Sequence, residues 1–343
     1  MNNSNTKKLN CSSQTSYADG RPQAQLRLEA MDYGPVLRHG DEVDPYGARD
    51  VFVFEHRGKY FMHYDAASEA GWLCALATSD DGVCWTKHRA VLEFGEAGEP
   101  DSASASYGTT FFDGTSWHMF YLGTPNVILP GKVPAFPYQT LKAQSRTADG
   151  TWIKQSGVIP VATVPNTFYA DTASPGMVVQ QGREFLMFFS AATHRSDGVK
   201  RTIGMAKTWD LNTVWAVDTE PVFPISEQIE NSSLYFETSS NLWFLFTNHV
   251  GIHPEATVEY TDAIWVYWSK NLTKWNPQNK AVVLDSSNCG WSKNIIGLPS
   301  VLKIGDRLAV YYDGHCGSDL WHTERDIGLA WLDLPLVPPQ MQY

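Results

Sequence analysis

Three carboxylates, Asp50, Asp171 and Glu230, each stand just before a short segment that is typical of a β-strand. A lone Asp in such a place is usually a turn or cap residue. Two carboxyl groups that face each other can cleave a glycosidic bond, because one protonates the leaving oxygen while the other activates a water on the opposite side. A third carboxylate nearby can raise the pKa of the acid through like-charge repulsion. This chemistry requires a fold that brings the three residues to one place.

A repeated unit supplies the elements that must position these carboxylates. In its clearest copy, Asp50 precedes an apolar strand at 51–54, a tight turn at 57–59 and an aromatic-rich strand at 60–64. Similar turns between paired strands recur at spacings of 56 to 68 residues, at 113–115, 181–183, 239–241 and 304–306. A third strand is expected after each pair, at 73–77, 140–144, 203–206, 264–268 and 327–330. In each of the first four units, a Trp and then a fourth apolar run follow the third strand. These apolar runs lie at 90–92, 157–159, 221–223 and 281–284.

These units predict an all-β fold, a five-bladed β-propeller whose four-stranded antiparallel blades surround a central funnel. The fifth unit lacks its fourth strand, and residues 34–37 copy the closing pattern. We expect this N-terminal strand to complete the last blade and to close the ring, which removes open sheet edges. Residues 1–23 are rich in Asn, Ser and Thr and are expected to form a disordered tail, so that 24–343 form one catalytic domain.

Strand order places further candidates on the same rim, because the first-strand entrances, the second-strand ends and the loops after them converge there. The candidates for substrate binding are Arg49, Asp65, Trp72, His194, His249, Trp291 and His315. Arg49 can either bind a substrate carboxylate or hydroxyl or hold Asp50 ionised. Trp72 and Trp291 are expected in rim loops, where an indole can stack on a sugar face. The histidines fit a polar core equally well, and their irregular spacing predicts no metal site. The Trp residues that repeat in register are interpreted as structural, at 85, 152, 215 and 275.

The pattern resembles the five-bladed glycoside hydrolases of family 43, to which families 32, 62 and 117 are related in fold. The resemblance spans residues 34–334. It implies that Asp50 is the general base, that Glu230 in Glu230-Asn231-Ser232-Ser233 is the general acid, and that Asp171 tunes that acid. The family's prolines after these residues are missing, and Asp44, in Asp44-Pro45-Tyr46, is a rival for the base.

The resemblance implies an exo-acting, inverting hydrolase that releases a terminal sugar from a plant or algal oligosaccharide. The sugar can be an α-L-arabinofuranoside, a β-xyloside or an anhydro-galactoside, and the sequence does not choose among them. Two other functions fit the same fold: a non-catalytic carbohydrate-binding propeller, and a glycoside phosphorylase, which needs a basic anion pocket on the rim. The reaction requires no cofactor, and the resemblance leaves room for a structural calcium or other ion in the channel.

The composition argues against several classes of binding partner. A formal net charge of −11 argues against nucleic-acid and anionic-membrane partners. No run of 18 apolar residues is present, so we expect no membrane span. The five cysteines contain no CxxC pair and predict neither zinc nor a disulfide framework. No secretory signal is visible, which favours the cytoplasm, and nothing in the sequence indicates the oligomeric state.

Overall fold

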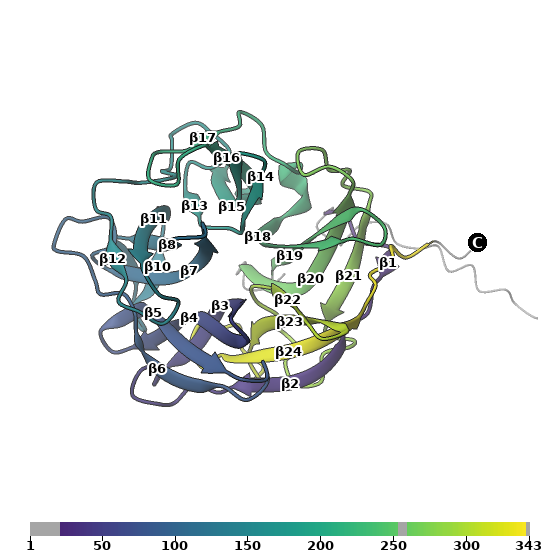
Figure 1. The fold of residues 1–343 in the computed structure, drawn as a ribbon, viewed down its shortest axis with the longest axis horizontal. Helices are drawn as coiled ribbons and strands as arrows, with labels where there is room; N and C mark the ends of the chain where they lie inside the picture. The colour runs from purple at the N-terminus through teal and green to yellow at the C-terminus, as the bar shows by residue number, and fades with distance from the viewer. Residues whose placement is uncertain (1–20, 253–258, 341–343) are drawn as a thin grey trace, which may run out of the picture.

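The computed structural model describes residues 21–252 and 259–340, and almost all of its regular structure is β (Figure 1). A single helical turn, the 3₁₀ segment η1 (Ile225–Glu227), occurs among the described residues. None of the described segments is a helix long and apolar enough to span a membrane. Most of the predicted tail lies outside the described residues. Arg21 does not fit that prediction, because it donates a hydrogen bond to the carbonyl of Val250 and its Nη1 lies 3.1 Å from Nε2 of His249.

The strands pair antiparallel within consecutive groups, which Figure 1 shows arranged around a common centre. Group one contains β3 (Gly47–His56), β4 (Lys59–Ser68), β5 (Gly71–Ser79) and β6 (Thr86–Ala90). Group two contains β7 (Ser104–Phe112), β8 (Trp117–Thr124), β11 (Gln139–Ser145) and β12 (Ile153–Lys154), with the hairpin β9 (Asn126–Ile128) and β10 (Val133–Ala135) inserted after β8.

The remaining groups repeat the plan. Group three contains β13 (Thr172–Ser174), β14 (Val178–Gln181), β15 (Glu184–Arg195), β16 (Gly198–Thr208) and β17 (Ala216–Val217). Group four contains β18 (Ile229–Glu237), β19 (Leu242–Ile252), β20 (Glu259–Ser269) and β21 (Lys280–Asp285). Group five contains β22 (Ser300–Ile304), β23 (Arg307–Gly314) and β24 (Asp326–Asp333). In group three, β13 and β14 both pair with β15 and together take the place of the first strand, and with that reading the first three strands of each group match the predicted unit.

The outermost strands of groups two and three differ from the prediction. The strands β12 and β17 lie closer to the preceding Trp than the expected runs at 157–159 and 221–223. An outermost strand is paired on one side only, so apolar content is a poor guide to where pairing occurs. The later run still touches the sheet in group three, where the N–H of Val222 donates to the carbonyl of Ile203 at 2.8 Å.

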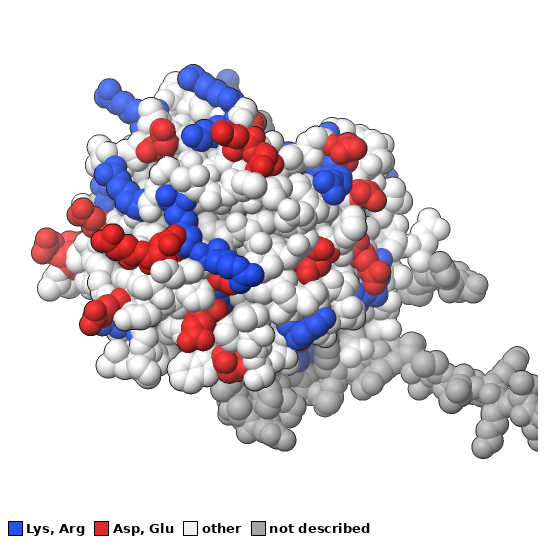
Figure 2. All heavy atoms as spheres, turned by 90° about the horizontal axis from the view of Figure 1, so that it is seen from below, with Lys and Arg blue, Asp and Glu red and all other residues white. Residues whose placement is uncertain are grey.

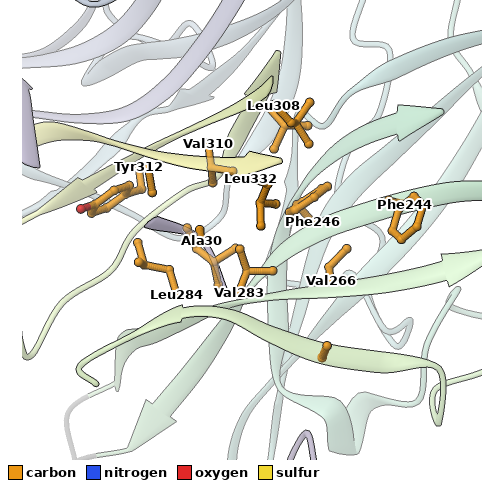
Figure 3. Close-up of a cluster of buried hydrophobic side chains, with 14 of the residues drawn as sticks. Ala30, Phe244, Phe246, Val266, Val283, Leu284, Leu308, Val310, Tyr312 and Leu332 are labelled. Atoms are coloured by element: carbon orange, nitrogen blue, oxygen red, sulfur yellow. The ribbon is translucent and has the colours of Figure 1, made fainter. Parts of the chain in front are cut away.

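The N-terminal segment joins the last two groups. The strand β2 (Met31–Leu37) pairs antiparallel with β24, with Gly34 opposite Leu329, which confirms the predicted pairing of 34–37. Just before it, β1 (Leu26–Arg27) pairs parallel with β21 of group four. Figure 3 shows the core beneath this junction, where Ala30 lies among Phe246 and Val283 of group four and Leu308 and Leu332 of group five.

The repeated Trp residues connect neighbouring groups, which supports their structural interpretation. Each indole lies 5.3 to 6.3 Å from a ring in the second strand of the preceding group. The four pairs are Trp152 with His63, Trp215 with Phe120, Trp275 with Phe188, and Trp85 with Tyr311. The last pair links group one to group five, at the two ends of the strand order.

The surface carries charge of both signs. On the face seen in Figure 2, acidic and basic side chains are interspersed and neither forms a broad area. That face therefore offers no extended basic surface of the kind that phosphate backbones require.

Candidate active site

Asp50 and Glu230 line the same cavity, whose volume is about 670 Å³. Asp50 comes from β3 in group one and Glu230 from β18 in group four. Neither side chain is on the outer surface away from this cavity. The strand arrangement therefore brings together two carboxylates that are 180 residues apart in the sequence.

A β-bulge on each first strand accompanies these residues. The register of β3 against β4 shifts between Arg49 and Phe52, and Asp50, within that shift, has a positive φ of 48°. The register of β18 against β19 shifts in the same way directly after Glu230, where Asn231 has a φ of 62°. A bulge inserts one residue and turns the following side chains, which is why bulges occur beside active sites. Asp and Asn tolerate the left-handed region better than most residues, although this signal alone would not have located the bulges.

Asp50 is held by charged neighbours on both its side chain and its backbone. Its Oδ2 accepts a hydrogen bond from Nε of Arg49 at 2.9 Å and lies 2.8 Å from Nη2 in the same ion pair. Its N–H donates to Oδ1 of Asp313 at 3.1 Å, and Oδ2 of Asp313 accepts from Nη1 of Arg325 at 2.9 Å. Burial raises the pKa of Asp50, Arg49 opposes this rise, and the charge of Asp313 adds to it. Of the two roles considered for Arg49, the structure shows the contact that favours the ionised base.

Asp65 provides a second carboxyl group beside Asp50. It lines the cavity, is buried, and accepts a hydrogen bond from the N–H of Tyr107. Burial and then the charge of Asp50 raise the pKa of Asp65 well above its ordinary value. A like-charge neighbour is therefore present beside the proposed base Asp50, whereas Asp171 was expected to tune the acid Glu230.

Glu230 has a guanidinium partner of its own. Its Oε2 accepts a hydrogen bond from Nη1 of Arg201 at 2.6 Å. Arg201, on β16, also lies over the ring of Phe136 at 5.6 Å, which fixes the plane of the guanidinium. Arg201 was not predicted from sequence, because the candidates came from first-strand entrances and second-strand ends, whereas Arg201 is on a third strand.

His322 was also missed, because it lies in the loop between β23 and β24 without a recognisable motif. Its Nδ1 lies 2.8 Å from Nη1 of Arg49. Since a guanidinium only donates, Nδ1 must accept, and the proton of the neutral ring is on Nε2. Desolvation within the concave site lowers the pKa of His322 well below its ordinary value, and the charges of Arg49, Arg325 and Arg201 lower it further. The ring is therefore a neutral donor at the cavity wall.

Asp171 and His194 form a pair at the edge of the cavity. Oδ2 of Asp171 accepts from the N–H of His194 at 2.6 Å and lies 2.9 Å from its Nδ1. His194 lines the cavity, as predicted, whereas Asp171 is not among the lining residues. The side chain of Asp171 therefore contacts the cavity wall through His194, and its carbonyl accepts from the N–H of Tyr138, which also lines the cavity.

Neither predicted stacking tryptophan faces the cavity. Trp72 is fully buried and donates from Nε1 to the carbonyl of Gly131 at 3.0 Å, so no sugar can stack on it and that prediction was wrong. Trp291 donates from Nε1 to the hydroxyl of Tyr312 at 2.7 Å and is not among the lining residues. Both indoles are used in packing within the fold.

Two predicted histidines lie elsewhere. His249 is fully buried, stacks on Trp265 at 4.1 Å and has Asp262 at 2.6 Å from its Nδ1. It is therefore a core residue, and its assignment to substrate binding was wrong. His315 lies 3.2 Å through Nε2 from Asp319 and lines a neighbouring cavity rather than the one that contains Asp50.

Asp44, the rival for the base, is a core residue. It is fully buried and accepts hydrogen bonds from the hydroxyl of Tyr64 at 3.0 Å and from Nζ of Lys87 at 2.9 Å. It does not line the cavity. Within the described part of the chain, no group of three or more His, Cys, Asp or Glu side chains is arranged to hold a metal ion.

Comparison with known proteins shows the fold. No family model and no curated protein matches the sequence. Solved structures do match, among them one described as a glycoside hydrolase at 15% identity, covering 92% of this protein and 96% of the other with a TM-score of 0.67. A structure of family GH130, described as mannoside phosphorylases that include glycoside hydrolases, matches at 11% identity, 96% and 99% coverage and a TM-score of 0.65. A GH62 α-L-arabinofuranosidase from Coprinopsis cinerea matches at 12% identity, 90% and 98% coverage and a TM-score of 0.59.

These structures, together with a family-43 glycoside hydrolase that also matches, confirm the predicted resemblance to propeller-type glycoside hydrolases. At identities of 11 to 15% the likeness concerns the fold. Function has to be argued from the residues of the cavity.

Proposed function

We propose that this protein is an exo-acting, inverting glycoside hydrolase in which Asp50 is the general base and Glu230 the general acid. The observation that carries the proposal is that these two carboxylates line one cavity from strands far apart in the sequence. The solved structures support the reaction class, because several are glycoside hydrolases on the same fold.

We read the five strand groups as five propeller blades, with β2 as the fourth strand of the last blade. The contact between Trp85 and Tyr311 and the hydrogen bond from the N–H of Asp50 to Asp313 join groups one and five, which supports a closed ring. In this arrangement the first strands surround the funnel, and their bulges turn Asp50 and Glu230 towards it.

In the proposed reaction, Glu230 gives its proton to the glycosidic oxygen while Asp50 removes a proton from the attacking water. Arg49 stabilises the ionised form of Asp50, and Asp313 fixes its backbone. Burial and the charge of Asp50 raise the pKa of Asp65, which favours its neutral form beside the base. Asp171 is a positioning residue for His194 on the cavity wall.

A terminal sugar is the proposed occupant, because the β9–β10 hairpin covers one side of the cavity. The candidates remain an α-L-arabinofuranoside, a β-xyloside and an anhydro-galactoside from a plant or algal oligosaccharide.

The test is a screen of nitrophenyl glycosides and plant and algal oligosaccharides, in which NMR follows the anomer of the released sugar. Asp50→Asn should abolish turnover of both substrate classes, Glu230→Gln should abolish or strongly reduce turnover of the oligosaccharides, and both variants should retain sugar binding. A lectin would bind sugar without turnover in the wild type, and release of the retained anomer would contradict the inverting mechanism.

A glycoside phosphorylase is the second candidate, because Arg49, Arg201, Arg325 and His322 lie around the cavity, a concentration of donors that the sequence did not reveal. One matching structure is described as belonging to a family of mannoside phosphorylases. Turnover that depends on inorganic phosphate and yields a sugar phosphate would establish this function instead of hydrolysis.

A further inference from the structure

A second cavity, of about 1070 Å³, adjoins the one that contains Asp50 and Glu230. The two share Ile128, Val133 and His322 as common wall residues. The second cavity is bounded by the β9–β10 hairpin, by residues 38–46 and by the loop at 315–326. The two cavities therefore meet at these residues, with His322 at their junction.

Large apolar side chains are exposed in this second cavity. Trp321 is 59% exposed, Tyr46 44%, Ile128 60% and Leu129 72%, and all four line it. They come from three separate segments of the chain. Side chains of this size are normally buried, so their convergence on one concave surface indicates a binding site. Aromatic faces with a polar edge suit the C–H-rich faces of sugar rings.

Some polar groups of the cavity are held by hydrogen bonds to one another. Asp326 is buried, and its carboxylate accepts from the N–H of His39 at 2.9 Å and lies 2.7 Å from Nδ1 of the same residue. Arg38 reaches the other oxygen of Asp326 at 3.1 Å while most of its side chain stays exposed. His322 presents its Nε2 proton at the junction. Oriented polar groups beside apolar platforms are the usual composition of a small-molecule site.

We propose that the second cavity is a saccharide subsite for the part of the substrate that extends beyond the sugar in the catalytic cavity. Trp321 and Tyr46 are its stacking platforms, and His322 donates to the sugar at the junction. The inference rests on the proposed function, and it adds that the substrate is an oligosaccharide of at least two units. Continuity with the catalytic cavity favours a saccharide over a separate protein partner, which would have no reason to reach His322.

The experiment is isothermal titration of the wild type and of Trp321→Ala with arabino-, xylo-, manno- and agaro-oligosaccharides of one to four units. Trp209→Ala is the matched control, because Trp209 is 76% exposed and is not among the residues that line the cavity. For the saccharide series that binds, we expect wild-type affinity to increase with length. Trp321→Ala should lose about tenfold in affinity for the longer members, with little change for the monosaccharide.

The proposal is overturned if affinity does not depend on length, if Trp321→Ala behaves as Trp209→Ala does, or if no series binds the wild type. Length-dependent binding without turnover would retain the subsite and contradict the hydrolase. Turnover of nitrophenyl glycosides that Trp321→Ala leaves unchanged for every substrate length would retain the hydrolase and contradict the subsite. A thermal melt checks the fold of each variant, and Tyr46→Ala carries the same expectation if Trp321→Ala does not fold.

Discussion

The backbone N–H of Asp50 donates to Oδ1 of Asp313 at 3.1 Å, so a carboxylate of group five fixes the proposed base in group one. Asp313 is fully buried, and its other oxygen accepts from Arg325. Asp50 has a φ of 48°, a conformation that costs of the order of 1 kcal/mol for a residue other than Gly. The hydrogen bond to Asp313 stabilises this conformation and thereby the direction of the Asp50 side chain.

The first prediction concerns the charge of Asp313. In Asp313→Asn the side-chain oxygen can still accept from the N–H of Asp50, while the negative charge is lost. Because that charge raises the pKa of Asp50 and Arg325 lowers it, the pKa of Asp50 should fall in the variant. The acidic limb of the pH profile of kcat/KM should then move to lower pH. The buried Arg325 loses its ion-pair partner, so we expect the variant to be about 3 kcal/mol less stable.

The control for this prediction is Asp319→Asn, which removes an equal charge from a more exposed carboxylate beside His315. Its pH profile should match the wild type. An acidic limb of Asp313→Asn that stays in place or moves to higher pH would contradict the proposed link between Asp313 and the base.

The second prediction distinguishes the general acid from the general base by comparing turnover of substrates with poor and good leaving groups. Glu230→Gln should lower turnover of natural oligosaccharides by about 100-fold or more, because an unprotonated sugar alcohol leaves slowly. The nitrophenyl leaving group needs little protonation, so turnover of nitrophenyl substrates should fall much less in Glu230→Gln. Asp50→Asn should lower turnover of both substrate classes to a similar extent, because both need an activated water.

Asp197→Asn is the matched control, since Asp197 lines the same cavity and pairs with Lys200 at its exposed edge. We expect near wild-type rates from it on both substrate classes. If the dependence on leaving group appeared in Asp50→Asn and not in Glu230→Gln, the two roles would have to be exchanged.

The third prediction concerns stability and Asp65. Its pKa is raised well above the ordinary value of 3.8, so the folded protein retains a proton that the unfolded chain releases as pH rises. The stability that the raised pKa of Asp65 contributes to the wild type is therefore lost progressively as the pH rises above about 4. Asp65→Asn imitates the neutral acid and retains an acceptor for the N–H of Tyr107, so its advantage in unfolding free energy should grow from about pH 4.5 to about pH 7. Asp65→Ala lacks that acceptor and should cost about 1–3 kcal/mol.

Urea denaturation of the wild type, Asp65→Asn and Asp65→Ala at about pH 4.5 and about pH 7 measures these differences in unfolding free energy. An advantage of Asp65→Asn that is constant with pH would show that Asp65 titrates as it does in the unfolded chain.

The strand plan could be predicted from sequence because each unit repeats the same local signals. Gly58 fixes the first turn, and the apolar strands on either side bury their side chains between sheets. The carboxylates Asp50 and Glu230 followed from this plan, because strand order determines which ends of the strands meet. The pairing of 34–37 with the last group followed for the same reason.

The rest of the site depends on contacts that spacing does not encode. Arg201 and His322 reach the cavity from a third strand and a loop, and no repeat marks them. Trp72 fits a rim loop by its position, yet the β9–β10 hairpin covers it, and its indole donates to the carbonyl of Gly131 in that hairpin. The β-bulge at Asp50 comes from one inserted residue, which leaves no trace in the apolar pattern.

The last prediction compares two ion pairs in which one oxygen of a buried carboxylate accepts from both a Tyr hydroxyl and a Lys. In group four, Oε2 of Glu227 accepts from the hydroxyl of Tyr267 and from Nζ of Lys280, and Glu227 and Lys280 are both buried. In group two, Oδ2 of Asp101 accepts from Tyr121 and from Lys154, whose side chain is 25% exposed. Removal of a buried partner leaves a charge that water cannot reach, so Lys280→Met should cost about 3–5 kcal/mol. Lys154→Met should cost less, because water can enter beside Asp101, and equal losses in urea denaturation would show that burial of the lysine does not set the cost.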